Sequence, residues 1–317
     1  MKSLSNIQSF VRVAEVQSFT GASNSIGLSA SAVSKAVGRL EADLGVKLFH
    51  RTTRSISLTS DGERFYEGCK QLLADLALLE AEVQGQHQVS PQGQLTLSIP
   101  EAFGRVCIVP LLGEFLQALP DLTINLSMDD YAVDLAAEGV DATIRTGALS
   151  DRANLIASRL TIYPMVACAS PEYLSRYGQP QHPDELAQHT CLNFRNRATG
   201  RFYPWMFSVD GISRQYSTTG NLVFDNSDAI AQSTIAGLGV SQMPAFLAAK
   251  ALANGDLLEV LRAYRPPEIP VWVCYLDRRF VAPRIRAFVD FMLGHRETFM
   301  MMCTWESEHA DTTDCCE

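Results

Sequence analysis

Residues 29–45 form the pattern that most restricts how this chain can fold, a short helix with one buried face and one polar face. Ser29 is a suitable N-cap, and Gly45 is a suitable residue for a left-handed C-terminal cap. Apolar side chains recur at helical spacing on one side, at Val33, Val37, Leu40 and Leu44. The opposite side is small and polar with one cation, and it consists of Ser31, Ser34, Lys35 and Gly38. Such a face fits a DNA major groove, although a merely solvated helix would show the same pattern if it stood alone.

Two further helices are predicted before this one. An apolar stripe at helical spacing indicates the first helix, at Leu4, Ile7, Phe10, Val11 and Ala14. The second is expected to follow Thr20 and to end at Gly27, with Ala22 and Ile26 facing inward. The polar-faced helix is therefore the third in a small helical bundle.

Directly after the third helix, Ile56 and Leu58 alternate with polar neighbours, which predicts a short two-stranded ribbon. Arg51 and Arg54 flank two threonines in this segment. Arginine and hydroxyl groups beside a recognition-type helix suit phosphate contacts and a narrow minor groove. Three helices and a ribbon predict an all-α winged helix-turn-helix over residues 1–60.

Charge is distributed unevenly along the chain. Residues 1–60 hold seven Lys or Arg residues and three Asp or Glu residues, whereas the 317-residue chain has a formal net charge of −9. A basic head on an acidic remainder indicates that the head alone meets a polyanion. A chance fluctuation of surface charge is the alternative.

The first sixty or so residues resemble the N-terminal signature of LysR-type transcriptional regulators, in the stretches FVRVAEVQSFTGAS and LSASAVSKAVGRLEADLGVKLFHRTTRSISLTSDGERFY. The resemblance implies a winged helix-turn-helix, a dimerising linker helix and a two-lobed effector-binding domain. By position, the candidate DNA-binding residues are Ser29, Ser31, Ser34, Lys35, Arg39, Arg51, Thr53 and Arg54. Ala30 and Ser31 stand where Gln-Pro is common in the family, and Ser23 stands where Ala is common. The first of these departures concerns the base-reading code rather than the fold.

A long linker helix is predicted over residues 61–88. Ser60 and Glu63 have the spacing of a capping box. Spacings of four and three then alternate along an apolar seam at Phe65, Cys69, Leu72, Leu76, Leu79 and Val83. A heptad seam favours pairing with a second helix, although packing on the chain's own body is the alternative. Candidate dimerisation residues are Phe65, Leu72, Leu76, Leu79 and Val83, and HQVSPQG after the helix marks a domain boundary.

Strands and helices alternate over residues 93–295, which predicts a C-terminal α/β domain with largely parallel sheets. Helices are expected at about 105–118, in YAVDLAAEG, in DAIAQSTIAG and at 284–293. The length suits a two-lobed, periplasmic-binding-protein-like domain with lobe I at about 93–161 and 268–295 and lobe II at about 162–267. Prolines mark the expected hinges, at Pro164, Pro266, Pro267 and Pro270. We expect the acidic tail, residues 300–317, to be disordered.

The family's effector cleft lies between the lobes, and open α/β sheets bind ligands beyond the carboxyl ends of their strands. Matching positions give the candidate effector-binding residues Pro100, Glu101, Ala102, Phe103, Arg145, Thr146, Gly147, Asp225, Asn226 and Ser227. Each of them could equally form a turn or a helix cap. Glu101 and Asp225 are acidic, so the sequence does not predict a cleft that binds only anions. Arg145 could pair with a ligand carboxylate or with one of these acids.

Catalytic and metal-binding motifs are absent from the sequence. It contains no G-x-S-x-G elbow, Walker loop or H-E-x-x-H motif, and its six histidines and eight cysteines lack metal-ligand spacing. We therefore expect no catalytic residues, no cofactor and no metal. No secretory region is visible, since Arg12 and Glu15 interrupt the first apolar pattern, so we expect a cytoplasmic protein with reduced thiols and no membrane partner.

Three classes of function are compatible with this organisation. A ligand-responsive transcription regulator is the interpretation that accounts for the basic head. A solute-binding receptor, or a cytosolic small-molecule-binding protein or enzyme with an accessory DNA-binding-like domain, would account for the two lobes alone. We predict the regulator, whose partners would be double-stranded promoter DNA, a small-molecule effector, a second copy of the chain and, as a further candidate, RNA polymerase. Tetramers are common in the family.

Overall fold

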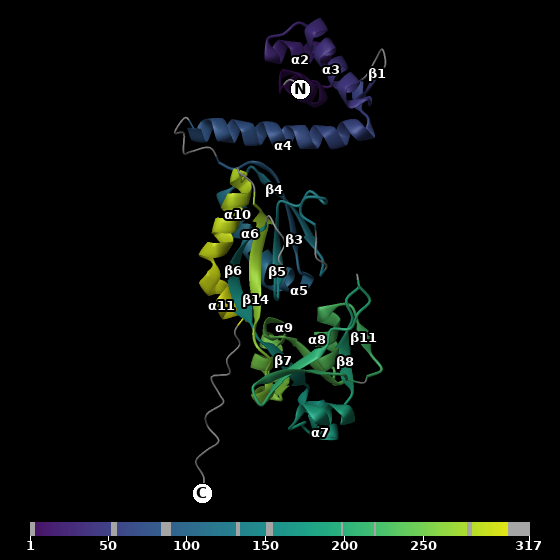
Figure 1. Cartoon of the computed structure of the whole chain (residues 1–317), viewed down its shortest axis with the longest axis vertical. Coiled ribbons are helices and arrows are strands. Elements are labelled where there is room, and N and C mark those ends of the chain that lie inside the picture. The colour runs from purple at the N-terminus through teal and green to yellow at the C-terminus, as the bar shows by residue number, and fades with distance from the viewer. Residues whose placement is uncertain are drawn as a thin grey trace. The chain divides into compact units, whose positions relative to one another are not determined.

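The computed structural model describes residues 4–51, 56–83, 90–130, 134–149, 155–197, 199–218, 220–277 and 281–303 (Figure 1). The chain divides into two compact units, Met1–Gln94 and Leu95–Glu317. No helix within these described ranges is long and apolar enough to cross a membrane.

The first unit begins with a helical bundle and a ribbon: α1 (Leu4–Val16), α2 (Phe19–Ile26), α3 (Ala30–Leu44), β1 (Phe49–Arg51) and β2 (Ile56–Leu58). Strands β1 and β2 pair antiparallel. This arrangement confirms the winged helix-turn-helix that the sequence predicted. The bundle is held by a core of large apolar side chains, among them Phe10, Val13, Val33, Val37, Leu40 and Leu48, all fully buried.

Helix caps set the ends of α2 and α3. The Ser29 hydroxyl accepts the N–H of Ala32, and Gly45 has a φ of 74°, as the sequence predicted for α3. Helix α2 starts earlier than predicted, at Phe19, because the Ser18 hydroxyl accepts the N–H of Gly21 at 3.1 Å. A serine rather than a threonine therefore defines the start of α2.

A buried carboxylate connects α3 to the wing. The Glu41 side chain is only 2% exposed. It accepts the backbone N–H groups of Leu48 at 3.0 Å and Phe49 at 3.4 Å, and the ammonium group of Lys47 lies 3.1 Å from it. These bonds satisfy the buried charge and fix the first strand of the ribbon against the third helix.

Helix α4 (Ser60–Val83) follows the ribbon, and its 24 residues span about 36 Å. Its N-cap is Thr59 rather than the predicted Ser60, because the Thr59 hydroxyl accepts the N–H of Gly62 at 2.9 Å and donates to the oxygen of Lys47 at 2.7 Å. A Cβ atom on Gly62 would lie 2.0 Å from the oxygen of Leu48. The start of α4 is thus in tight contact with the residues before the wing.

The second unit contains two five-stranded sheets that define two lobes. Lobe I has the strand order β4-β3-β5-β14-β6, with β3 (Gly93–Ile99), β4 (Leu122–Met128), β5 (Ala142–Thr146), β6 (Leu155–Tyr163) and β14 (Ile269–Leu276). Its helical segments are α5 (Glu101–Phe103), a π-helical turn η1 (Gly104–Ile108), α6 (Val109–Ala118), α10 (Pro283–Gly294) and α11 (Arg296–Cys303).

Lobe II has the strand order β11-β8-β12-β7-β13, with β7 (Met165–Ala169), β8 (Cys191–Phe194), β11 (Val223–Phe224), β12 (Val240–Pro244) and β13 (Leu258–Val260). A separate hairpin consists of β9 (Trp205–Val209) and β10 (Ile212–Tyr216). The helical segments are α7 (Pro171–Tyr177), η2 (Pro183–Gln188), α8 (Ser227–Ile235), α9 (Ala245–Asn254) and η3 (Arg262–Tyr264).

Both sheets are mixed, which corrects the expectation of largely parallel sheets. In lobe I, β3 and β5 are parallel, but β14 runs antiparallel to β5 and β6. In lobe II, β11, β8 and β12 are parallel, whereas β7 is antiparallel to β12 and β13. Strands β7 and β14 each enter their sheet from the other lobe rather than through a helical crossover, so nothing requires them to be parallel. These two passages lie at Pro164 and between Tyr264 and Ile269, where the prolines had suggested hinges.

Two predicted helices differ from the structure. The helix expected at 105–118 begins at Glu101 and contains the π-helical turn, because Pro110 lacks the N–H that a regular helix needs. In the segment YAVDLAAEG, the described residues form a hydrogen-bonded turn instead of a helix. The Asp134 carboxylate accepts two nearby backbone N–H groups there, and Gly139 has a φ of 66°.

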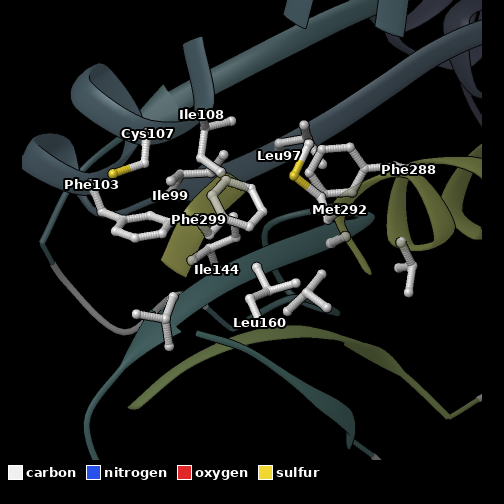
Figure 2. Close-up of a cluster of buried hydrophobic side chains, with 14 of the residues drawn as sticks. Leu97, Ile99, Phe103, Cys107, Ile108, Ile144, Leu160, Phe288, Met292 and Phe299 are labelled. Carbon is white, nitrogen blue, oxygen red and sulfur yellow. The ribbon is translucent and has the colours of Figure 1, made fainter. Parts of the chain in front are cut away.

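The predicted disordered tail is also corrected at its start, because α11 continues to Cys303. Phe299 and Cys303 are fully buried in the core of lobe I. Figure 2 shows the Phe299 ring within that core, together with Phe103 and Ile144. Residues 304–317 lie outside the described residues.

Candidate DNA-binding surface and interlobe site

Helix α3 exposes the small polar face that the sequence predicted. Ser31, Lys35 and Arg39 are exposed and Ser34 is half-buried, because the opposite side of the helix is fully buried in the bundle. The Ser29 hydroxyl is already used as the helix cap and lies 3.1 Å from the Ser31 hydroxyl. The face therefore offers two hydroxyl groups and two cations on one rigid element.

The wing places one predicted DNA-binding residue at the end of β1. Arg51 pairs with Ile56 across the ribbon. Thr53 and Arg54 lie outside the described residues, as does the side chain of Arg51. Their DNA-binding roles stay predictions, on a ribbon whose base is fixed by Glu41.

The apolar seam of α4 is divided between two environments. Cys69 is buried and Phe65 packs with it on the core of the first unit, where the rings of Phe65 and Phe10 are 5.4 Å apart. Leu72, by contrast, is 51% exposed. Phe65 thus packs within its own chain, and its role in dimerisation stays a prediction. The side chains of Leu79 and Val83 lie outside the described residues.

An ion pair joins the two lobes of the second unit. Arg105 lies in the π-helical turn of lobe I, and its Nε donates to Glu101 Oε1 at 3.1 Å. Its Nη2 lies 3.2 Å from Oδ1 of Asp228, in the first turn of α8 in lobe II. One guanidinium group therefore connects a carboxylate on each side of the lobe boundary.

A second contact between the lobes involves Asp130, which follows β4. The side-chain amide of Asn196 in lobe II donates to the backbone oxygen of Asp130 at 3.3 Å. The Asp130 carboxylate accepts the N–H of Glu101 at 3.2 Å. Desolvation raises the pKa of Asp130, the hydrogen bond from Glu101 opposes this, and the nearby charges of Glu101 and Asp129 raise the pKa further.

Thr146, at the exposed end of β5, and its sequence neighbour Arg145 do not share one side of the sheet. Burial raises the pKa of Tyr163, and the Thr146 side chain partly opposes this. In the strand register, Thr146 is opposite Val271 and Arg145 is opposite Trp272. Successive residues of a strand point to opposite faces, so the structure does not bring Arg145 and Thr146 together on one face.

The other predicted effector residues fall into three groups. Ala102 and Phe103 are buried in the lobe I core, where the Phe103 ring packs on Phe246 and Phe299, so they are not available to a ligand. Asn226 caps α8 by accepting the N–H of Ala229 at 2.9 Å. Exposed or half-exposed positions remain at Pro100, Glu101, Gly147, Asp225 and Ser227.

Sequence reasoning missed Arg105, Asp228, Asp130 and Asn196, which make the contacts between the lobes. Of these contacts, the sequence indicates only the ion pair of Glu101 and Arg105, because residues four apart are neighbours on a helix. Across the described ranges, no group of three or more His, Cys, Asp or Glu side chains could hold a metal ion. The interlobe site is therefore a polar site with one arginine among three carboxylates.

Comparisons with known proteins agree with this organisation. Two protein-family models match, the bacterial regulatory helix-turn-helix protein of the lysR family over residues 4–63 and the LysR substrate binding domain over residues 88–297. The uncharacterised HTH-type transcriptional regulator YhjC of Escherichia coli (strain K12) is 33% identical over 95% of this chain and 100% of its own length. The HTH-type transcriptional regulator PtxR of Pseudomonas aeruginosa is 32% identical over 94% of this chain and 95% of its own.

Two solved structures extend the similarity to the fold. CrgA, a LysR-type transcriptional regulator from Neisseria meningitidis, has a TM-score of 0.60 and 28% identity, covering 92% of this chain and 98% of its own. The Vibrio cholerae virulence activator AphB has a TM-score of 0.59 and 27% identity, covering 93% and 99%. The chain belongs to the LysR family of transcriptional regulators, with an N-terminal DNA-binding helix-turn-helix and a C-terminal effector-binding domain.

Proposed function

We propose that the chain binds promoter DNA through α3 and the wing as a dimer, and that a small-molecule effector at the lobe boundary changes this binding. The observation that carries the proposal is the exposed face of α3. This face exposes Ser31, Lys35 and Arg39 to solvent, whereas the apolar side chains on the opposite side of α3 are fully buried. A helix held in this way can enter a major groove with its side chains in a fixed arrangement.

Within this proposal, Ser34 reads base edges and the wing contacts the phosphate backbone. A serine hydroxyl can donate to or accept from several base edges, so a small residue in the groove supports specificity. Arg51, Thr53 and Arg54 supply the charge and hydroxyl groups that phosphate oxygens require. Lys35 and Arg39 add cations on the same side of α3.

The proposed dimer uses the distal part of α4. Because Phe65 and Cys69 pack within the chain, the seam offered to a partner is Leu72, Leu76, Leu79 and Val83. Leu72 is 51% exposed in the single chain. Burying this apolar side chain against the α4 helix of a second chain would contribute favourable free energy to dimerisation. Two paired chains would present two recognition helices to two half-sites on DNA.

The proposed effector is a small polar molecule with an anionic group. Arg105 is the cation that bridges the lobes, and an anion that replaces Asp228 at its guanidinium would separate α8 from lobe I. Asn196, which donates to Asp130 beside Glu101, offers an amide group on the lobe II side, and Thr146 stays a candidate from the sequence. A ligand changes the arrangement of the lobes only to the extent that it binds one arrangement more tightly.

Footprinting on the DNA beside the chain's own gene tests the DNA-binding part. Ser34→Ala should weaken binding to the protected site by about 1–3 kcal/mol while leaving the affinity for random DNA nearly unchanged. Ser213→Ala, at an exposed serine of β10, is the matched control. Equal losses on specific and random DNA would show that Ser34 does not read bases.

A thermal-shift screen of small mono- and dicarboxylic acids on the full-length protein tests the effector part. A compound that raises the melting temperature should also change the footprint. Thr146→Ala and Asp228→Asn, one on each lobe, should reduce both effects, whereas Thr123→Ala at an exposed position of β4 should not. An acid that acts equally on all three variants binds elsewhere.

A further inference from the structure

A cavity of about 510 Å³ lies within lobe II, apart from the residues that join the lobes. It opens between the β9–β10 hairpin and the neighbouring strands β8 and β11. None of the residues predicted to bind an effector lines it. The residues that matter for its chemistry are Asn193, Phe202, Tyr203, Trp205, Tyr216 and Thr218.

The part of the lining that the structure describes has no ionic side chain, in contrast to the lobe boundary. Of the described residues around the cavity, none is Lys, Arg, His, Asp or Glu. Four are aromatic, and Phe202 and Tyr203 at the rim are 58% and 51% exposed, whereas Trp205 is 4% exposed. The Tyr203 ring packs on that of Phe194, with ring centroids 5.4 Å apart, but half of Tyr203 and more than half of Phe202 stay exposed beside the cavity. Such aromatic surface favours a flat apolar ligand.

One buried amide gives the cavity a hydrogen-bond donor. Asn193 is 9% exposed, and its Oδ1 accepts the indole N–H of Trp205 at 3.1 Å and the hydroxyl of Thr218 at 2.7 Å. Since an indole nitrogen only donates, the orientation of the Asn193 amide is fixed, with the oxygen toward Trp205. The amide nitrogen has no hydrogen-bond partner among the described residues, and the side chain lines the cavity.

We propose that this cavity is a second small-molecule site, specific for uncharged planar compounds that carry a carbonyl group. The rings of Phe202 and Tyr203 would contact the face of the ligand, and the Asn193 amide would donate to its carbonyl oxygen. A carboxylate would lose its hydration here without gaining a counter-charge, so charged analogues are rejected. The site therefore selects a different chemical class from the anionic effector proposed for the lobe boundary.

The cavity is placed to influence that boundary. Phe202 at its rim pairs with Arg195, the residue before Asn196, and Asn196 donates to the oxygen of Asp130 across the lobe boundary. The backbone N–H of Tyr203 also donates to the oxygen of Phe194 on β8. An occupied cavity would thus order the rim beside the residues where the lobes meet.

Ligand-observed NMR titration of the full-length protein with coumarin, a neutral planar lactone, tests the proposal. We expect saturable binding that Phe202→Ala and Tyr203→Ala each weaken about two- to tenfold, the range for the loss of an aromatic contact. Both residues are exposed, so melting temperatures should stay close to that of the unaltered protein. Tyr177→Ala, at a tyrosine of lobe II that is 63% exposed and outside the cavity, is the matched control and should not change the affinity.

Two further probes separate the chemistry of the site from general hydrophobicity. Coumarin-3-carboxylate should bind at least tenfold more weakly than coumarin because of its charge, and naphthalene should bind about two- to tenfold more weakly because it cannot accept from Asn193. Equal affinity of the charged and neutral lactones would overturn the proposal. So would a loss of coumarin binding in Thr146→Ala with none in Tyr203→Ala, because the compound would then lie at the lobe boundary.

Discussion

The DNA-binding unit and the lobe boundary surround their carboxylates in opposite ways. In the first unit, Glu41 is buried, and it accepts two backbone N–H groups and a lysine ammonium. At the lobe boundary, Asp130 accepts one N–H group, and its pKa is raised first by desolvation and then by the nearby charges of Glu101 and Asp129. A surface that recognises DNA has to stay in one arrangement, whereas a site that responds to a ligand needs two arrangements of similar free energy.

The largest expected effect tests whether Glu41 holds the wing. Glu41→Ala leaves two buried N–H groups without their acceptor, and each such group costs about 1–3 kcal/mol. We therefore expect the first unit to lose about 3 kcal/mol of stability or more, measured by hydrogen exchange. DNA binding should fall with it, because the ribbon would no longer be fixed to α3.

Glu41→Gln and Glu15→Ala are the matched variants for this prediction. Glutamine keeps an acceptor for the two N–H groups and loses only the charge, so its effect should be smaller. Glu15 forms an exposed ion pair with Arg12, and its removal should cost less than about 1 kcal/mol. If the amide protons of the first unit exchanged at the same rates in Glu41→Ala and in the unaltered protein, Glu41 would not stabilise the wing. The contrast between Glu41 and Asp130 would then not hold.

The second prediction asks whether α4 pairs two chains. Leu76→Lys places a charge in the proposed seam, where desolvation opposes its burial. Sedimentation should show dimers at least about tenfold weaker, and the DNA footprint should shrink toward one half-site. Ala77→Lys, at the adjacent exposed position, should leave the dimer intact. Unchanged assembly in Leu76→Lys would assign dimerisation to the second unit.

The helix-turn-helix could be predicted from the sequence because its determinants are local. The stripe of Val33, Val37 and Leu40 lies on one helix, so spacing alone gives both the buried face and the opposite polar face. The seam of α4 was only partly predictable. Spacings of three and four place Phe65 and Leu72 on one side of a helix, but they do not indicate whether the partner is the same chain or another.

The lobe boundary could not be predicted in the same way, because it is assembled from segments far apart in the chain. Arg105 and Asp228 meet only once both lobes have folded, and no periodic pattern connects them. Arg145 and Thr146 are neighbours in sequence, but the alternation of a strand sends them to opposite faces. Local patterns therefore gave no indication that Arg105, rather than Arg145, is the arginine that connects the two lobes.

The third prediction extends the comparison to charge. Arg54→Ala should reduce the slope of log affinity against log salt by about one, if one phosphate contact is lost, and should weaken specific and random DNA alike. Arg214→Ala, at an exposed arginine of β10 in the second unit, should leave both affinity and slope unchanged. A salt titration in which Arg54→Ala matches the unaltered protein would remove this residue from the DNA interface.

The smallest expected effect concerns Asp130 and returns to the second carboxylate. Because the folded state raises its pKa, the native protein binds more protons than the unfolded chain between the usual aspartate pKa and the raised value. Stability therefore falls as pH rises through this window, and the ionised side chain disfavours the native arrangement at neutral pH.

Asp130→Asn keeps an oxygen for the N–H of Glu101 and cannot ionise. It should raise the melting temperature slightly at pH 7 and flatten the pH dependence in the acid range. Glu101→Gln removes one of the charges that raise this pKa, so thermal melts from pH 4 to 7 should show a shallower slope for it as well. Steeper or unchanged slopes in both variants would mean that the carboxylates at the lobe boundary are as well satisfied as Glu41, and that the strain needed for a switch lies elsewhere.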